Sequence, residues 1–379
     1  MKAKSIKGKT FHEIQAAFKQ NLTDGFKPNL ALVFISSRDE RETVCSMLNK
    51  ENITVFGATT AGEFIDDDID IDSIVILLLD INPDYFRITF KENDYNASRE
   101  KAKSIADFGL NEFSNPGFII SIAGRKVNGV DIIAGIQEKA GTNAFIYGGL
   151  AGNTISGTEL FVFDNNNITN NGLVVLVVDL DKIKITGFAT SGWQPIATFH
   201  TITKSEHNVA FTIDDEPAMD MIGQYLGMKF GKTAEDGKIF SDDARPLQLY
   251  RDNAPSVLRE ITYFNSKTRE VGFAGPVPQG SRFRFSLPPD WDIVEKIKAD
   301  CIVVKELFPD PDALIVFSCA SRLQSLGPMV KDEIKEIKNT WNCPVAGFFS
   351  FGEIGNYLGG HTEYHNNTCS IVLLKEKDA

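Results

Sequence analysis

A pattern that recurs three times along the chain constrains the fold more than any other feature of the sequence. Each copy begins with a short apolar run of strand length, closed by small residues and one arginine. A stretch with helical spacing follows, and after it a second short run enters a glycine-rich loop. A further apolar run ends the copy. The recurrence predicts three β-α-β-β units, and therefore an α/β protein with mixed sheets.

The three copies share the same order of segments. Their first apolar runs are 30–35, 118–122 and 314–319, and the arginines that follow are Arg38, Arg125 and Arg322. Their glycine loops are 56–63, 147–153 and 346–353. The first and third loops share Gly-x4-Gly-Glu, as Gly57, Gly62 and Glu63 in one and Gly347, Gly352 and Glu353 in the other. The copies close with the apolar runs 74–79, 173–178 and 370–374.

The repeat also predicts a ligand site. A right-handed β-α-β crossover makes the first two strands of a unit parallel, so the arginine and the glycine loop end at one edge of the sheet. Arginine offers a planar fork to a carboxylate, glycine lets backbone N–H groups approach a ligand, and a glutamate can receive an amine. The predicted ligand-binding residues are Arg38, Gly57, Gly62, Glu63, Arg125, Gly148, Gly149, Gly152, Arg322, Gly347, Gly352 and Glu353.

A structural interpretation of the same residues remains open. Glycines after a strand often make a tight reversal, and an arginine at a strand end often pairs with a neighbouring acid. The recurrence also follows from duplication of a scaffold, so it supports the architecture more strongly than it supports a site.

Composition excludes several classes of partner. The formal net charge of −12 disfavours nucleic acid, because an acidic surface repels phosphate backbones. The basic start of the chain has no apolar run behind it, and the longest apolar runs are too short to cross a bilayer. We therefore expect a cytoplasmic protein with no membrane partner.

The five cysteines form no CxxC pair, and His361 and His365 are flanked by turn-forming residues. The sequence thus predicts no metal site and no cofactor.

The segment between the second and third copies differs in character. Residues 229–289 are rich in glycine and proline and contain short β-type runs. They predict a smaller, mostly β insertion in the C-terminal half.

Several segments, taken together and in order, resemble the FIST family. They are 60–63, 148–153, 192–196, 213–220, 275–281, 319–322, 347–355 and 365–368. The resemblance implies a FIST N-terminal domain over 25–213 and a FIST C-terminal domain over 214–375. Members are sensory input modules for small ligands such as amino acids, and they occur in bacterial signalling proteins. This sequence shows no output domain, so the resemblance implies a signalling protein that acts in trans.

The sequence and the resemblance together predict a small-ligand-binding sensory module for intracellular signal transduction. The predicted ligand is an amino acid or other small carboxylate at the strand-end loops. We find no G-x-S-x-G, Walker A or G-x-G-x-x-G motif and predict no catalytic residues. The alternative is a hydrolase- or lyase-type enzyme with Glu63 or Glu353 as general base. A third reading is an interaction module, which would expose a large apolar patch.

Overall fold

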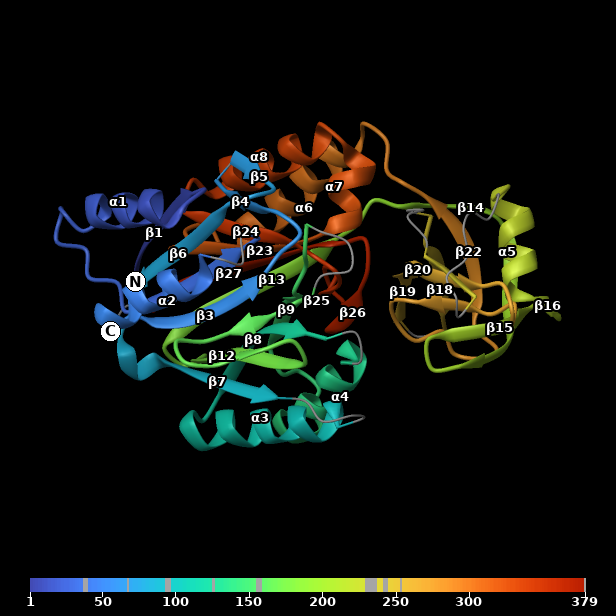
Figure 1. The fold of residues 1–379 in the computed structure, drawn as a ribbon, viewed down its shortest axis with the longest axis horizontal. Helices are drawn as coiled ribbons and strands as arrows, with labels where there is room; N and C mark the ends of the chain where they lie inside the picture. The colour runs from blue at the N-terminus through green and yellow to red at the C-terminus, as the bar shows by residue number, and fades with distance from the viewer. Residues whose placement is uncertain are drawn as a thin grey trace. The chain divides into compact units, whose positions relative to one another are not determined.

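The computed structural model describes residues 1–36, 40–66, 68–92, 97–124, 127–154, 159–228, 237–240, 245–252 and 254–377. The chain forms two units. Residues 1–190, 291–364 and 368–379 make up the first, which we call the α/β unit, and residues 191–290 with 365–367 make up the second, the β unit. Helices alternate with mixed sheets in the α/β unit (Figure 1), which confirms the predicted fold class.

Three six-stranded sheets build the α/β unit, one around each repeat. The first sheet has the order β1 (Lys2–Gly8), β6 (Ile74–Asp80), β2 (Leu30–Ile35), β3 (Thr54–Thr59), β10 (Val162–Phe163) and β11 (Ile168–Thr169). The second runs β26 (Glu363–His365), β25 (Glu353–Gly355), β9 (Ile146–Leu150), β8 (Pro116–Ala123), β12 (Gly172–Asp179) and β7 (Phe86–Glu92). The third runs β13 (Ile183–Thr190), β27 (Cys369–Glu376), β23 (Ala313–Cys319), β24 (Val345–Ser350), β4 (Glu63–Ile65) and β5 (Asp68–Asp70).

Each repeat is a parallel strand pair joined by a helix and closed by an antiparallel strand. The parallel pairs are β2–β3, β8–β9 and β23–β24. The closing strands are β6, β12 and β27. The connecting helices are α2 (Arg41–Lys50), α4 (Gly129–Ala140), and α7 (Ala320–Leu326) with α8 (Met329–Trp341). The three predicted β-α-β-β units are therefore confirmed.

The repeats exchange short strands in a closed cycle, which the sequence did not predict. Strand β4 of the first repeat pairs with β24 of the third, and β25 of the third pairs with β9 of the second. Strand β10 of the second repeat pairs in turn with β3 of the first. Because every repeat completes the sheet of another, none of the three has its full sheet alone.

The three sheets face one another across a shared apolar core, with helices outside. Alternate strand residues point to opposite faces, so Leu32, Ile119 and Ile315 join this core, while their strand neighbours pack under helices. Phe348 contacts Phe34 of the first repeat and Phe317 of its own, with ring centroids 4.8 and 5.4 Å apart. Aromatic pairs of this kind add about 0.5–1.5 kcal/mol each beyond burial.

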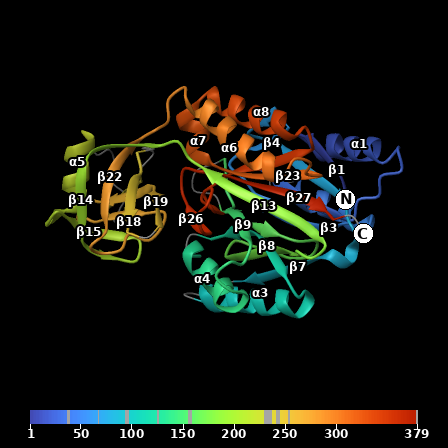
Figure 2. The ribbon, with the colours of Figure 1, turned by 180° about the vertical axis from the view of Figure 1, so that it is seen from behind.

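The outer helices complete three further clusters. Helices α1 (Phe11–Asn21) and α2 cover the first sheet, and α3 (Ser98–Glu112) and α4 cover the second. Helices α6 (Ile293–Leu307), α7 and α8 cover the third. In the α/β unit, α3 and α4 lie along one side and α6 to α8 along the opposite side (Figures 1 and 2). A short 3-10 turn, η1 (Pro83–Tyr85), precedes β7.

The β unit contains the predicted β insertion and begins before it, at residue 191. Its strands are β17 (Lys238–Phe240), β20 (Ile261–Asn265), β21 (Val271–Phe273), β15 (Val209–Ile213), β14 (Gln194–Glu206), β22 (Arg282–Leu287), β18 (Leu247–Arg251) and β19 (Ala254–Arg259), with β16 (Glu216–Pro217) beside β15. Helix α5 (Ala218–Leu226) packs on this sheet through Met221 and Ile222 and ends at Gly227 in the left-handed conformation. Within the described residues, no helix combines the length and the apolar character needed to cross a membrane.

Candidate functional site

The three glycine loops meet at one place in the α/β unit. The backbone N–H of Gly152 donates to the carbonyl of Thr59 at 2.8 Å, and that of Ala61 donates to Phe349 at 3.0 Å. The N–H of Leu150 donates to the carbonyl of Gly352 at 2.8 Å. Each loop is thus hydrogen-bonded to both of the others, and the strand ends of all three repeats converge.

Gly152 lies at the tightest point of this junction. A Cβ atom at Gly152 would lie 2.5 Å from the backbone nitrogen of Ala61 and 2.9 Å from the carbonyl oxygen of Phe349. Both distances are too short for carbon, so only glycine lets the three backbones approach this closely. Gly62 adds to the junction, because its carbonyl accepts from the N–H of Phe349 at 2.8 Å.

Four of the predicted glycines lie within strands, and three of these occupy equivalent places in the register. Gly57 pairs with Val33, Gly148 with Ile120, and Gly347 with Val316. A side chain at Gly57 or Gly347 would overlap the ring of Phe163 or Phe64, respectively, which the exchanged strand of another repeat supplies. A side chain at Gly148 would meet the carbonyl of Ile120. These glycines leave room for the strand exchange.

The remaining two glycines of the predicted set also have close neighbours. A Cβ atom at Gly149 would lie 2.9 Å from the ring of Phe317, and one at Gly352 would overlap the hydroxyl of Tyr364. Both positions require glycine for packing.

Glu63 is completely buried beside the junction. Its carboxylate accepts hydrogen bonds from the hydroxyls of Ser73 at 2.9 Å and Ser36 at 3.2 Å, and from Thr60. Burial raises the pKa of Glu63 to about 7, because the charged form loses its hydration, although the three hydroxyls oppose the shift. The group therefore exchanges its proton near neutral pH.

Glu353 has the same surroundings in the third repeat. Its carboxylate accepts from the hydroxyls of Ser350 at 2.7 Å and Thr368 at 2.9 Å, and from the N–H of Thr368 at 3.3 Å. Burial raises the pKa of Glu353 to about 8.

The second repeat has no acid at this position. Glu63 and Glu353 face Phe348 and Gly149 across their strand pairs, and the equivalent residue facing Ala58 is Val162. Both glutamates were predicted from the sequence, but their hydroxyl partners were not. The signal was present, because Thr60 and Ser350 each stand three residues before the glutamate.

Of the three predicted arginines, the structure describes one, Arg322. Arg38 and Arg125 lie outside the described residues. Arg322 lies on α7, where a loop was expected, and its side chain is completely buried. Its guanidinium forms an ion pair with the buried carboxylate of Glu333 on α8, with Nε donating to Oε2 at 3.2 Å. This ion pair agrees with the structural interpretation that the sequence left open, in which an arginine after a strand pairs with a neighbouring acid.

The junction thus combines two buried acids that titrate near neutral pH with backbones that fit closely together. Across the part of the chain that the structure describes, no group of three His, Cys, Asp or Glu side chains could hold a metal ion.

Comparison with protein families covers most of the chain. The FIST N domain model matches residues 29–216, and the FIST C domain model matches residues 218–356. No curated protein matched the sequence. FIST domains are sensory domains of signal-transduction proteins. The two matches together span well over half of the sequence, and the chain belongs to the FIST family.

Proposed function

We propose that this chain is a small-ligand-binding sensory module that acts in signal transduction. Its ligand is an amino acid or another small carboxylate, bound at the edge where the three glycine loops meet. The observation that carries the proposal is the convergence of all three repeats and both buried glutamates at that edge. Membership of the FIST family supports the sensory role.

The proposed contacts use two arginines that follow the first strands of two repeats in the sequence. Arg38 follows Ser36, whose hydroxyl donates to Glu63, and Arg125 follows Gly124 at the end of β8. In the proposal, both arginines bind the ligand carboxylate through their planar forks. An ammonium group on the ligand does not contact the buried carboxylates of Glu63 and Glu353, but its positive charge stabilises their ionised forms from a distance. Ligand binding then releases protons near neutral pH.

The strand exchange offers a route for the signal. The loop that ends β3 continues directly into β4, which belongs to the sheet of the third repeat. A shift of the first glycine loop on binding therefore moves β4 at the edge of the third sheet. The shift also reaches the second sheet, because β25 of the third repeat pairs with β9. A signalling protein in trans would read this change.

The enzyme alternative has one observation in its favour, which is that the pKa values of Glu63 and Glu353 suit a general base. A base must also reach the proton that it removes. Both carboxylates are 0% exposed and already accept hydrogen bonds from their own repeat, so we assign neither a catalytic role.

Thermal unfolding in the presence of amino acids and small carboxylates tests the proposal. A ligand at 100 times its Kd stabilises the folded state by about 2.7 kcal/mol, which raises the melting temperature by a few degrees. The substitutions Arg38→Ala and Arg125→Ala should each abolish most of that shift. Arg99→Ala is the matched control, because Arg99 pairs with Glu138 on the outer helix layer.

Two results would count against the proposed site. One is the absence of any concentration-dependent shift across the amino and carboxylic acids. The other is a full shift that survives in both Arg38→Ala and Arg125→Ala, which would place the ligand elsewhere. Calorimetry at pH 7 in buffers of different ionisation enthalpy measures the expected proton release.

A further inference from the structure

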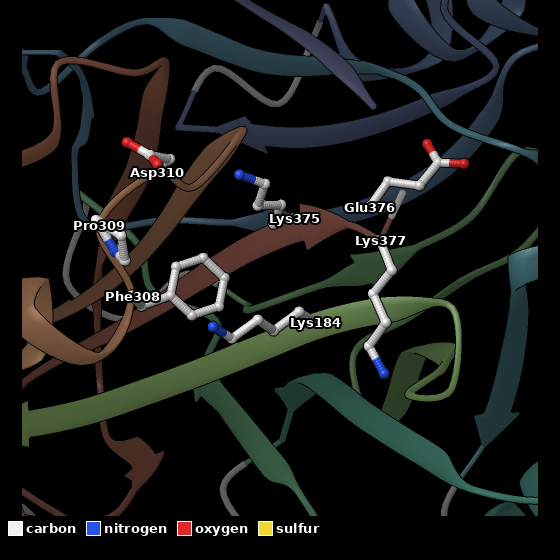
Figure 3. Close-up of a pocket in the computed structure, with 7 residues that line it drawn as sticks. All are labelled: Lys184, Phe308, Pro309, Asp310, Lys375, Glu376 and Lys377. Carbon is white, nitrogen blue, oxygen red and sulfur yellow. The ribbon is translucent and has the colours of Figure 1, made fainter. Parts of the chain in front are cut away.

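A cavity of about 270 Å³ lies at the other end of the third sheet. It is lined by Lys184, Phe308, Pro309, Asp310, Lys375, Glu376 and Lys377 (Figure 3). Thr368, which holds Glu353, directly precedes β27, and Lys375 lies near the end of that strand. Seven residues of extended chain separate them by about 23 Å. The cavity is thus distinct from the glycine-loop junction.

Two lysines face each other directly at this cavity. Lys184 on β13 and Lys375 on β27 are cross-strand partners in an antiparallel pair. Side chains at such positions have Cβ atoms about 5 Å apart, and like charges there destabilise the sheet. Both side chains extend toward the segment that carries Phe308 and Asp310 (Figure 3).

The surroundings leave this positive charge largely uncompensated. The Lys184 ammonium lies 4.5 Å from the centroid of the Phe308 ring and 3.4 Å from the carbonyl oxygen of Leu307. Among the residues that the structure describes, the Lys375 ammonium has no ion-pair or hydrogen-bond partner. Glu376 points away from the pair and binds the ammonium of Met1 at 2.9 Å (Figure 3).

The Phe308 ring is held in place before any ligand arrives. Its backbone N–H donates to Val304 at 2.8 Å, and its carbonyl accepts from the indole of Trp341 at 2.9 Å. The side chain is only 1% exposed. The ring is almost completely covered, so the exposed Pro309 beside it supplies most of the apolar surface of the cavity, which needs no rearrangement on binding.

Protection of a sheet edge does not account for both lysines. Lysine on an edge strand discourages pairing with other chains, and β13 stands at the end of the described sheet order. Lys375, however, is on β27, which lies between β13 and β23. A second lysine there adds repulsion without protecting an edge.

We propose that this cavity binds a small phosphate monoester. The phosphate lies between the ammonium groups of Lys184 and Lys375, and the apolar part of the ligand lies against Phe308 and Pro309. Lysine binds phosphate as a compact point charge, and two ammonium groups match the charge of up to about −2 that a phosphate monoester carries near neutral pH. Typical ligand pockets have volumes of about 300–1,000 Å³, so a cavity of this size selects a small molecule. Asp310 accepts a hydrogen bond from a donor on the ligand.

Titration of the full chain with phenyl phosphate, followed by calorimetry, tests the proposal. We expect saturable binding that weakens about tenfold or more in Lys184→Gln and in Lys375→Gln. Lys298→Gln removes an exposed lysine from α6 in the same unit and should leave the Kd unchanged. Arg38→Ala should also leave it unchanged, which separates this site from the one at the glycine loops. Benzoate, which carries a carboxylate on the same ring, should bind about tenfold more weakly.

Melting temperatures provide an independent check on the lysine pair. Without phosphate, Lys375→Gln should melt no lower than the wild type, because the substitution removes a repulsion. Inorganic phosphate should raise the melting temperature of the wild type more than that of Lys375→Gln. Absence of saturable phenyl phosphate binding, a Kd in both lysine variants equal to that of the wild type, or tighter binding of benzoate would each overturn the proposal.

Discussion

Glu63 and Glu353 occupy the same position in two of the three repeats, and each accepts a hydrogen bond from the hydroxyl of the residue three places before it. In the second repeat, Val162 stands at the position of the acid. Ala151 stands at the position of the hydroxyl, because it follows Gly148 by three residues, as Thr60 follows Gly57 and Ser350 follows Gly347. The acid and its partner are therefore present as a set or absent as a set. This is expected of a buried carboxyl group, because it is stable only where hydrogen bonds compensate its lost hydration.

The two glutamates should make stability fall as pH rises. Their folded-state pKa values, about 7 and about 8, exceed the ordinary value of 4.5, so the folded protein retains protons that the unfolded chain has lost. The stabilisation is complete below pH 4.5 and is lost as pH rises through the folded-state values, with a slope of up to about 1.4 kcal/mol per pH unit for each group. Urea unfolding between pH 5 and pH 8 should show a smaller decline in Glu63→Gln and Glu353→Gln, but not in the exposed Glu51→Gln. An identical pH profile in all four proteins would exclude this account.

Introducing the acid into the second repeat should be costly. Val162→Glu buries a carboxyl group opposite Ala58 with no hydroxyl at residue 151. We expect a loss of about 3 kcal/mol in the free energy of unfolding at pH 8. The double substitution with Ala151→Thr should recover part of that loss. A single variant as stable as the wild type, measured by chemical denaturation, would contradict the compensation argument.

Substitution of Gly152 should disturb all three repeats. In Gly152→Ala the new Cβ atom would overlap backbone atoms of Ala61 and Phe349, which cannot move independently. We expect destabilisation of about 3 kcal/mol. Gly25→Ala is the control, because no atom lies near the Gly25 Cβ position; its positive φ alone should cost about 1 kcal/mol. Equal melting temperatures for the two variants would show that the junction is not tightly packed.

The buried ion pair between Arg322 and Glu333 should be required as a pair. Arg322→Ala leaves the Glu333 carboxylate buried without its partner, at a cost of about 3–5 kcal/mol. Replacing both residues, as Arg322→Met with Glu333→Leu, should be less destabilising than Arg322→Ala alone. A double-mutant cycle by chemical denaturation measures the coupling, and additive losses would show that the two side chains act independently.

The periodicity of the sequence was sufficient to predict the repeats but not their connections. The strand pairs β2–β3 and β23–β24 follow from apolar runs with a helical stretch between them, since a parallel pair needs such a crossover. The exchanged strands could not be found in this way. Strand β10 has two residues and β4 has three, too short for any period, and their partners lie in other repeats.

The candidate site was predictable in part, for a similar reason. Glu63 and Glu353 were visible because the Gly-x4-Gly-Glu spacing repeats. Ser73 and Thr368 were not, because the distance from the glutamate to the next strand differs between the two repeats. The cavity beside Lys184 and Lys375 was also missed, since these residues become neighbours only through the pairing of β13 with β27.

The cyclic exchange sets an order of events during synthesis of the chain. Asp66, which directly follows β4, accepts a hydrogen bond from the backbone N–H of Val345, a residue 279 positions later. At about 5–20 residues per second, a ribosome needs roughly 15–55 s to cover that distance. During this interval β4 can pair only with β5 in its final sheet, and its edge on the β24 side has no partner, although residues 191–290 of the β unit have already been synthesised. The nascent chain therefore carries an unpaired edge that only its own last repeat can cover.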